Sequence, residues 1–118
     1  MSYALKIYVK DEIVMSRKIS WNDDNDLEVI QKSLNVDSAD VQSLTDSIDA
    51  WVDDFGALKK GNYIIGLNIN GNNYQLVGKI LLLGLDNKTG KTRGLSEKEM
   101  AWISQNIHIW QKPIGFIN

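Results

Sequence analysis

The pair Asn70-Gly71 constrains the fold of this chain more than any other feature of its sequence. Both residues of a tight two-residue hairpin turn need positive φ, which asparagine and glycine adopt more readily than other residues. Turning the chain there places apolar side chains on one face of the hairpin and largely polar ones on the other. The predicted cross-strand pairs are Leu67 with Tyr74, Ile65 with Leu76, Tyr63 with Gly78, Asn68 with Asn73 and Gly66 with Gln75. We expect the second strand to continue through Ile80–Leu83, an apolar run typical of a central strand covered by helix.

The N-terminal residues predict a second hairpin. Apolar and polar side chains alternate from Tyr3 to Val9, and another run of strand-forming residues extends from Ile13 to Ile19. A turn between these runs gives two antiparallel strands. A short helix through Leu27–Leu34 is expected to follow, with Asn25 or Asp26 as its N-cap.

Residues 38–55 carry apolar side chains at helical spacing. The apolar stripe consists of Val41, Leu44, Ile48, Trp51, Val52 and Phe55, with Ser38 as a suitable N-cap and Gly56 as a stop. On such a helix Asp46, Asp49 and Asp53 form one outward-facing row. Like charges at this spacing cost a helix about 0.2–0.5 kcal/mol per pair, so the row suggests selection for something other than helix stability.

A C-terminal helix begins at Ser96, which forms a capping box with Glu99 while Leu95 and Met100 form a hydrophobic staple. Its expected buried face is Met100, Ile103 and Ile107, and Ile114–Ile117 is expected to add an edge strand after Pro113. The element order ββ-α-ββ-α predicts an α+β fold, in which an antiparallel sheet of about four or five strands has helices packed on one face. A chain of 118 residues is expected to form a single domain over residues 1–118.

The sequence lacks the residues that most catalytic and metal sites require. It has no cysteine and one histidine, His108, which excludes a thiolate nucleophile, a sulfur-ligated zinc site and a histidine pair. Gly90-Lys91-Thr92 resembles the end of a phosphate-binding loop, but Leu85 stands where that motif needs its first glycine. The carboxylates of residues 23–28 miss the glycine and ligand spacing of a calcium loop. We therefore expect no enzymatic activity, no cofactor and no metal.

The formal net charge is −2, but the charges are segregated along the chain. Residues 21–55, which we call the acidic segment, hold ten acidic side chains and one basic side chain, Lys32, whereas the residues on both sides are net basic. Charge asymmetry of this kind bears on partners rather than on fold. The first ten residues do not form a signal-peptide core and no apolar run is long enough to span a membrane, so we expect a soluble, cytoplasmic protein.

The acidic segment predicts a surface that docks a basic protein. The predicted partner-binding residues are Trp21, Asp23, Asp24, Asp26, Glu28, Asp46, Asp49, Asp53 and Asp54. Trp21 is the expected exposed anchor, because Trp51 belongs to the inner stripe of the predicted helix. A solvated face that only confers solubility explains the same charges.

Two functions fit this charge layout. The first is a non-enzymatic, stoichiometric inhibitor or immunity-type protein that neutralises a basic partner such as a nuclease toxin, since a phosphate-binding cleft attracts carboxylates. The alternative is an interaction or assembly module, for example a phage or secretion-system component, which self-associates through its sheet. Direct nucleic-acid binding is disfavoured, because the protein is acidic and Lys88, Lys91 and Arg93 lie in a loop without interleaved aromatic residues. The oligomeric state stays open.

Overall fold

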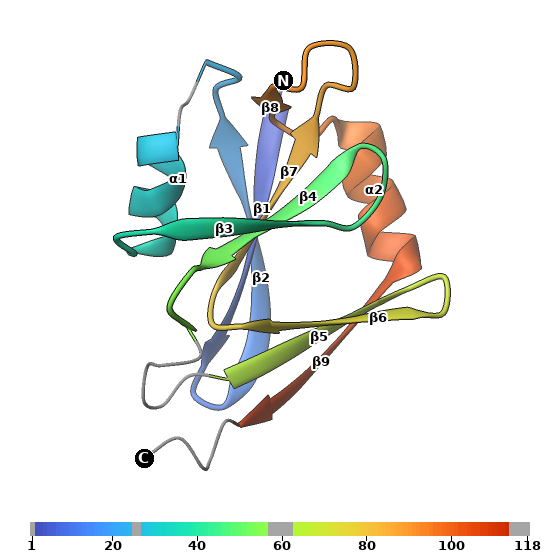
Figure 1. Cartoon of the computed structure of the whole chain (residues 1–118). Coiled ribbons are helices and arrows are strands. Elements are labelled where there is room, and N and C mark those ends of the chain that lie inside the picture. The colour runs from blue at the N-terminus through green and yellow to red at the C-terminus, as the bar shows by residue number, and fades with distance from the viewer. Residues whose placement is uncertain (1, 25–26, 57–62, 114–118) are drawn as a thin grey trace.

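The computed structural model, shown in Figure 1, describes residues 2–24, 27–56 and 63–113. Within these ranges the chain forms nine strands and two helices. The elements are β1 (Ser2–Lys10), β2 (Ile13–Trp21), α1 (Leu27–Leu34), β3 (Ala39–Ser43), β4 (Ile48–Asp53), β5 (Tyr63–Ile69), β6 (Asn72–Val77), β7 (Ile80–Leu85), β8 (Thr92–Arg93), α2 (Glu97–Asn106) and β9 (Ile107–Pro113). The fold is a mixture of antiparallel sheet and helix, as predicted, but it contains more sheet than the expected four or five strands.

Six of the strands form one antiparallel sheet in the order β2-β1-β7-β4-β3, with β8 paired to the end of β7. β7 lies in its interior, hydrogen-bonded to β1 on one side and to β4 on the other. Its first four residues, Ile80–Leu83, are completely buried, because both faces of the strand are covered. The apolar run is therefore the central strand that the sequence predicts.

β5, β6 and β9 form a smaller sheet in the order β6-β5-β9. Asn70 and Gly71 make the turn with φ of 52° and 86°, and the β5–β6 register contains the predicted pairs Leu67 with Tyr74 and Ile65 with Leu76. The expected continuous strand from β6 into Ile80–Leu83 is wrong. β6 ends before Gly78, whose positive φ of 85° is incompatible with a continuous strand. β7 then pairs within the larger sheet instead of extending β6.

The N-terminal hairpin is also confirmed. Asp11 and Glu12 occupy its turn with φ of 52° and 66°, and β1 pairs with β2 along its whole length, from Ser2 opposite Trp21 to Lys10 opposite Ile13. The short helix is present as α1 from Leu27 to Leu34.

The predicted helix over residues 38–55 is wrong, because this segment forms the hairpin of β3 and β4. Its turn is closed by Thr45, whose Oγ1 accepts hydrogen bonds from the backbone N–H groups of Ser47 and Ile48 at 3.2 and 3.1 Å. Ile48 and Val52 fit a helical repeat and also a repeat of two, so the apolar pattern does not distinguish the two structures. β-branched and aromatic residues in β4 favour the strand. Ser38 caps no helix, and its Oγ donates to Asp54 Oδ2 at 3.2 Å.

Two apolar clusters lie on opposite faces of the larger sheet. α1 covers one face, where Ile30 and Leu34 pack with Leu81 and Leu83 of β7. The smaller sheet and α2 cover the other face, where the partners include Ile80 and Leu82 of the same strand. The two helices are therefore on opposite faces (Figure 1), and the expectation that both pack on one face is wrong.

α2 begins as predicted. Glu99 N donates to Ser96 Oγ at 3.1 Å, and Ser96 N donates to Glu99 Oε1 at 3.0 Å, which completes the capping box. Ile107 is the C-cap and the first residue of β9, so it is buried from a strand rather than from the helix face. The predicted strand Ile114–Ile117 lies outside the described residues.

Arg93 ties the start of α2 to the larger sheet. Its Nη1 and Nη2 donate to Glu99 Oε1 and Oε2 at 2.7 and 3.0 Å. The adjacent Arg93 guanidinium lowers the pKa of the Glu99 carboxyl below its ordinary value. Glu99 therefore joins the capping box to an ion pair.

None of the helices in the described ranges has the length and apolar content needed to cross a membrane.

Ser96→Ala is expected to lower the free energy of unfolding by about 1 kcal/mol, because it leaves the Glu99 backbone N–H without its cap. Urea denaturation at neutral pH measures the loss. Ser104→Ala, at an exposed position of the same helix, is the matched control and is expected to change stability little. Equal losses in the two variants would contradict a capping role for Ser96.

Candidate functional site

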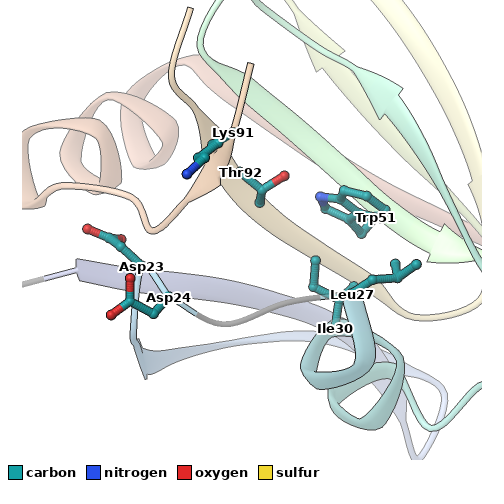
Figure 2. Close-up of a pocket in the computed structure, with 7 residues that line it drawn as sticks. All are labelled: Asp23, Asp24, Leu27, Ile30, Trp51, Lys91 and Thr92. Carbon is teal, nitrogen blue, oxygen red and sulfur yellow. The ribbon is translucent and has the colours of Figure 1, made fainter. Parts of the chain in front are cut away.

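A cavity of about 380 Å³ opens in the acidic segment, between the start of α1 and β8 (Figure 2). It is lined by Asp23, Asp24, Leu27, Ile30, Trp51, Lys91 and Thr92. Most of these side chains belong to the acidic segment, whereas Lys91 directly precedes β8 and Thr92 is its first residue. We call this cavity the Trp51 pocket. It combines two carboxylates, one ammonium group, one hydroxyl group and an indole ring with aliphatic side chains.

Trp51 lines the pocket because strand alternation turns its side chain toward α1. It pairs with Val41 and Leu81 across the sheet and packs in the apolar cluster beneath α1. Its buried indole nitrogen has no hydrogen-bond partner within the described ranges, and Figure 2 shows this nitrogen on the side of the ring toward Thr92. A buried donor without an acceptor costs about 1–3 kcal/mol. Such groups are uncommon in native proteins.

The two carboxylates of the pocket have different tasks. Asp23 holds two parts of the chain together, since its Oδ1 accepts from Gly94 N at 2.7 Å and its Oδ2 accepts from Ser2 Oγ at 3.3 Å. The carboxylate of Asp24 makes no hydrogen bond or ion pair with the described residues, and only its backbone N–H is used, donating to Asn22 Oδ1 at 2.9 Å. Asp24 is exposed. It is therefore the carboxylate that is free to receive a cation.

Asp49 does not lie in an exposed row with Asp46 and Asp53, as the helical prediction required. It faces the same side of the sheet as Trp51, opposite Leu83, and is 6% exposed. No hydrogen-bond donor from the described part of the chain reaches its carboxylate. Burial raises the pKa of the Asp49 carboxyl above its ordinary value, because an apolar environment disfavours the charged form. Asp49 is thus a buried acid and is not available to a partner.

The other predicted residues are dispersed. Trp21 is 7% exposed and packs in the cluster beneath α1, so the expectation of an exposed anchor there is wrong. Glu28 is exposed in the first turn of α1, and Asp46 is exposed in the turn between β3 and β4. Asp26 lies outside the described residues.

Asp53 and Asp54 lie at the end of β4 and make local hydrogen bonds. Asp53 Oδ1 accepts from Phe55 N at 3.0 Å, and Asp54 Oδ2 accepts from Ser38 Oγ. The structure thus brings Asp23 and Asp24 together in the pocket, whereas Asp46 lies before the start of β4 and Asp53 and Asp54 lie at its end.

Only Asp23 and Asp24 of the pocket were among the predicted partner-binding residues, and Lys91 and Thr92 were the least expected of the others. They appear in the sequence as part of a polar loop, but the loop folds back so that Thr92 pairs with Leu85. The turn is fixed by Asp86, whose backbone N–H donates to Lys91 O and whose carbonyl accepts from Gly90 N, at 2.9 and 2.7 Å. Glycine at position 90, with φ of 71°, was the available signal of a tight turn.

A second cavity, of about 400 Å³, lies on the other side of the sheet, between the β3–β4 turn and α2. Its lining includes Asp46, Ile48, Lys98 and Trp102. Glu99 also reaches it, but that carboxylate is already paired with Arg93. No set of three or more His, Asp or Glu side chains that could hold a metal ion is found among the residues that the structure describes.

Asp49→Asn is expected to raise the free energy of unfolding at about pH 8 by less than about 1 kcal/mol, because it removes the charge of a largely buried side chain. Since burial raises the pKa of Asp49, the folded state binds this proton more tightly than the unfolded state. Wild-type stability therefore falls as the pH rises through the folded-state pKa, and the variant should lose this dependence. Urea denaturation between about pH 4 and about pH 8 tests both effects. Asp46→Asn, at an exposed position of the same hairpin, should leave the pH dependence unchanged.

Comparison with known proteins gives a family and no named function. No curated protein and no solved structure matches this chain. The model of a family described as a domain of unknown function, DUF3846, matches residues 5–108. Because this range covers most of the chain, the protein belongs to the DUF3846 family.

Proposed function

We propose that this protein is a non-catalytic binding protein whose acidic segment docks a basic protein partner around the Trp51 pocket. The observation that carries the proposal is the position of Asp24, an exposed carboxylate without a partner among the described residues. It lies on a pocket whose other walls include the Trp51 ring and aliphatic side chains. Charge steers such an encounter, and contact with buried aromatic and aliphatic groups supplies affinity.

The chemistry of the pocket suits a lysine or arginine side chain of the partner. The methylene groups of such a side chain pack well against Leu27, Ile30 and Trp51, while its charged end is placed near Asp24. The ammonium group of Lys91, which points toward the side of the pocket where Asp23 and Asp24 lie (Figure 2), repels a second cation. The exposed acid Glu28, next to Leu27 in the first turn of α1, extends the negative surface beyond the pocket.

A stoichiometric inhibitor or immunity-type protein fits this surface best. A nuclease, as one example of the partner class, has a cationic cleft that binds phosphates, and an acidic protein covers such a cleft without needing catalytic groups of its own. Most residues that line the pocket belong to the acidic segment. The same segment therefore supplies both the negative charge and the pocket that would receive a side chain of the partner.

The alternative of self-association through the sheet gains less support at β3, the sheet edge in the acidic segment. There Asp40 Oδ1 accepts the Val41 backbone N–H at 2.9 Å, and Gln42 Nε2 donates to the Ser43 carbonyl at 3.1 Å. These side chains occupy backbone groups that a neighbouring strand would need. Natural proteins protect sheet edges against pairing in comparable ways.

Neutralising two acids beside the pocket tests the charge component. The partner is first isolated from the native host by affinity capture, and its association with the wild type and with an Asp24→Asn, Glu28→Gln double variant is then followed by surface plasmon resonance at several salt concentrations. We expect the variant to associate roughly tenfold more slowly at low salt and to show a weaker salt dependence. Asp11→Asn with Glu12→Gln removes the same charge from the β1–β2 turn and is expected to have little effect. A captured partner that is not basic, or an unchanged rate in the first variant, would refute this mode of docking.

Leu27→Ala tests the anchor component. Leu27 is 49% exposed on the pocket wall, so its truncation is expected to cost little stability but to speed dissociation of the partner about fivefold. Ile13→Ala, at a position that is 65% exposed on the β1–β2 hairpin, is the matched control. Dissociation rates that do not differ between the two variants would contradict insertion of a side chain into the pocket.

A further inference from the structure

The two edges of the larger sheet differ in how their backbone groups are used. β3 forms one edge, and the side chains of Asp40 and Gln42 cap two of its backbone groups. β2 forms the other edge and is nine residues long. Over the described ranges, the backbone of β2 makes ladder hydrogen bonds to β1, and no side chain caps it. β2 is therefore the edge at which another strand can be added.

The side chains along β2 are exposed and cationic at its middle. Arg17 and Lys18 are adjacent, so they project from opposite faces of the strand. Lys18 Nζ lies 4.4 Å from the centre of the Tyr3 ring, which holds this cation beside the edge. Neither side chain forms an ion pair with a described acidic residue.

The register of the hairpin adds to the positive charge. Lys6 of β1 lies directly opposite Arg17, an arrangement in which like charges destabilise a sheet. The pKa of Lys6 is lowered, first by burial and then by the nearby charges of Lys79 and Arg17. The β1–β2 hairpin thus holds several cations close together, and their mutual repulsion lowers its stability. A bound anionic partner would reduce this repulsion.

Exposed apolar side chains adjoin these cations. Ile13 is 65% exposed and Met15 is 42% exposed, and both alternate with Arg17 on the same face of β2. α1 covers this face of the sheet at the other end of the strand, where Ile19 and Trp21 pack. Along one face, β2 therefore exposes two apolar side chains, Ile13 and Met15, followed by the cation of Arg17.

We propose that β2 is a docking edge that adds an extended acidic peptide segment of a partner protein as a further strand of the sheet. The backbone of the peptide pairs with the free edge of β2. Acidic side chains of the peptide lie beside Arg17 and Lys18, and apolar ones lie over Ile13 and Met15. Main-chain hydrogen bonds supply affinity in this mode of recognition, and the side chains supply specificity. The site lies on the edge of the sheet opposite β3 and is separate from the Trp51 pocket.

A peptide fits this edge better than other anions. Nucleic acid satisfies the cations but offers no alternating N–H and C=O groups for the open ladder. The acidic segment of a second copy fits poorly as well, because its exposed edge strand, β3, is already capped by Asp40 and Gln42. An extended acidic segment meets both the charge and the hydrogen-bonding requirement.

The test uses a synthetic peptide as long as β2, with two adjacent glutamates flanked by alternating threonine and valine. Binding to the full chain is followed by fluorescence anisotropy, and amide hydrogen exchange is followed residue by residue with and without the peptide. We expect slower exchange at alternate amides of β2, and binding that is about tenfold weaker or more for Arg17→Glu with Lys18→Glu. Lys88→Glu with Lys98→Glu makes the same change of charge elsewhere and should bind as the wild type does.

Two altered probes separate strand addition from general attraction between charges. A peptide with lysine in place of glutamate, and a glutamate peptide N-methylated at alternate residues, are both expected to lose about tenfold or more in affinity. The inference is overturned if the methylated peptide binds equally well, or if exchange slows at another edge instead of β2. It is also overturned if a single-stranded oligonucleotide of equal charge competes while no β2 amide gains protection.

Discussion

The complete burial of β7 is the constraint on which the rest of the structure depends. Four successive apolar side chains, Ile80–Leu83, alternate between the two faces of the larger sheet and need cover on both. α1 supplies the cover on one face, and the smaller sheet with α2 supplies it on the other. At about 25 cal/mol per Å² of apolar surface, burying such side chains contributes several kcal/mol, so the layers are organised around this strand. β1 and β4 pair with its two edges and make it an interior strand.

The same strand sets the position of the Trp51 pocket. Trp51 pairs with Leu81, and Thr92 pairs with Leu85, so two residues of β7 bring together segments that are distant in sequence. α1 then closes the third side, because Ile30 packs against the apolar face that β7 presents. The pocket is thus a consequence of how the central strand is covered. The Trp51 indole N–H and the Asp49 carboxyl add polar groups beneath this layer that make no hydrogen bond with the described part of the chain.

The sequence predicts the parts of this fold that depend on local chemistry. Positive φ at Asn70 and Gly71 and the reciprocal bonds of Ser96 and Glu99 are set by neighbouring residues, so both elements were predictable in detail. Residues 38–55 were not, because Ile48 and Val52 suit either a helix or a strand, and only pairing with β7 decides between them. The predicted row of Asp46, Asp49 and Asp53 depended on that helix, and the predicted exposure of Trp21 depended on its acidic neighbours in the sequence. Both predictions are wrong. The approach of Lys91 to α1 depends on the topology of the whole sheet, which no local pattern contains.

The charge segregation of the sequence becomes a difference between the two edges of one sheet. The acidic segment contains the edge strand β3, where Asp40 serves as a cap as well as a charge. The basic N-terminal hairpin contains the other edge strand, β2, which has no such cap among the described residues. A chain selected only for solubility would gain from protecting both edges, since each is open to unwanted pairing. Here only the shorter edge is protected, and the longer open edge favours association with another strand. The like charges of Lys6 and Arg17, which lie opposite each other, lower stability. That asymmetry agrees with the two surfaces that we propose, one for the side chains of a basic partner at the Trp51 pocket and one for the backbone of an acidic peptide at β2.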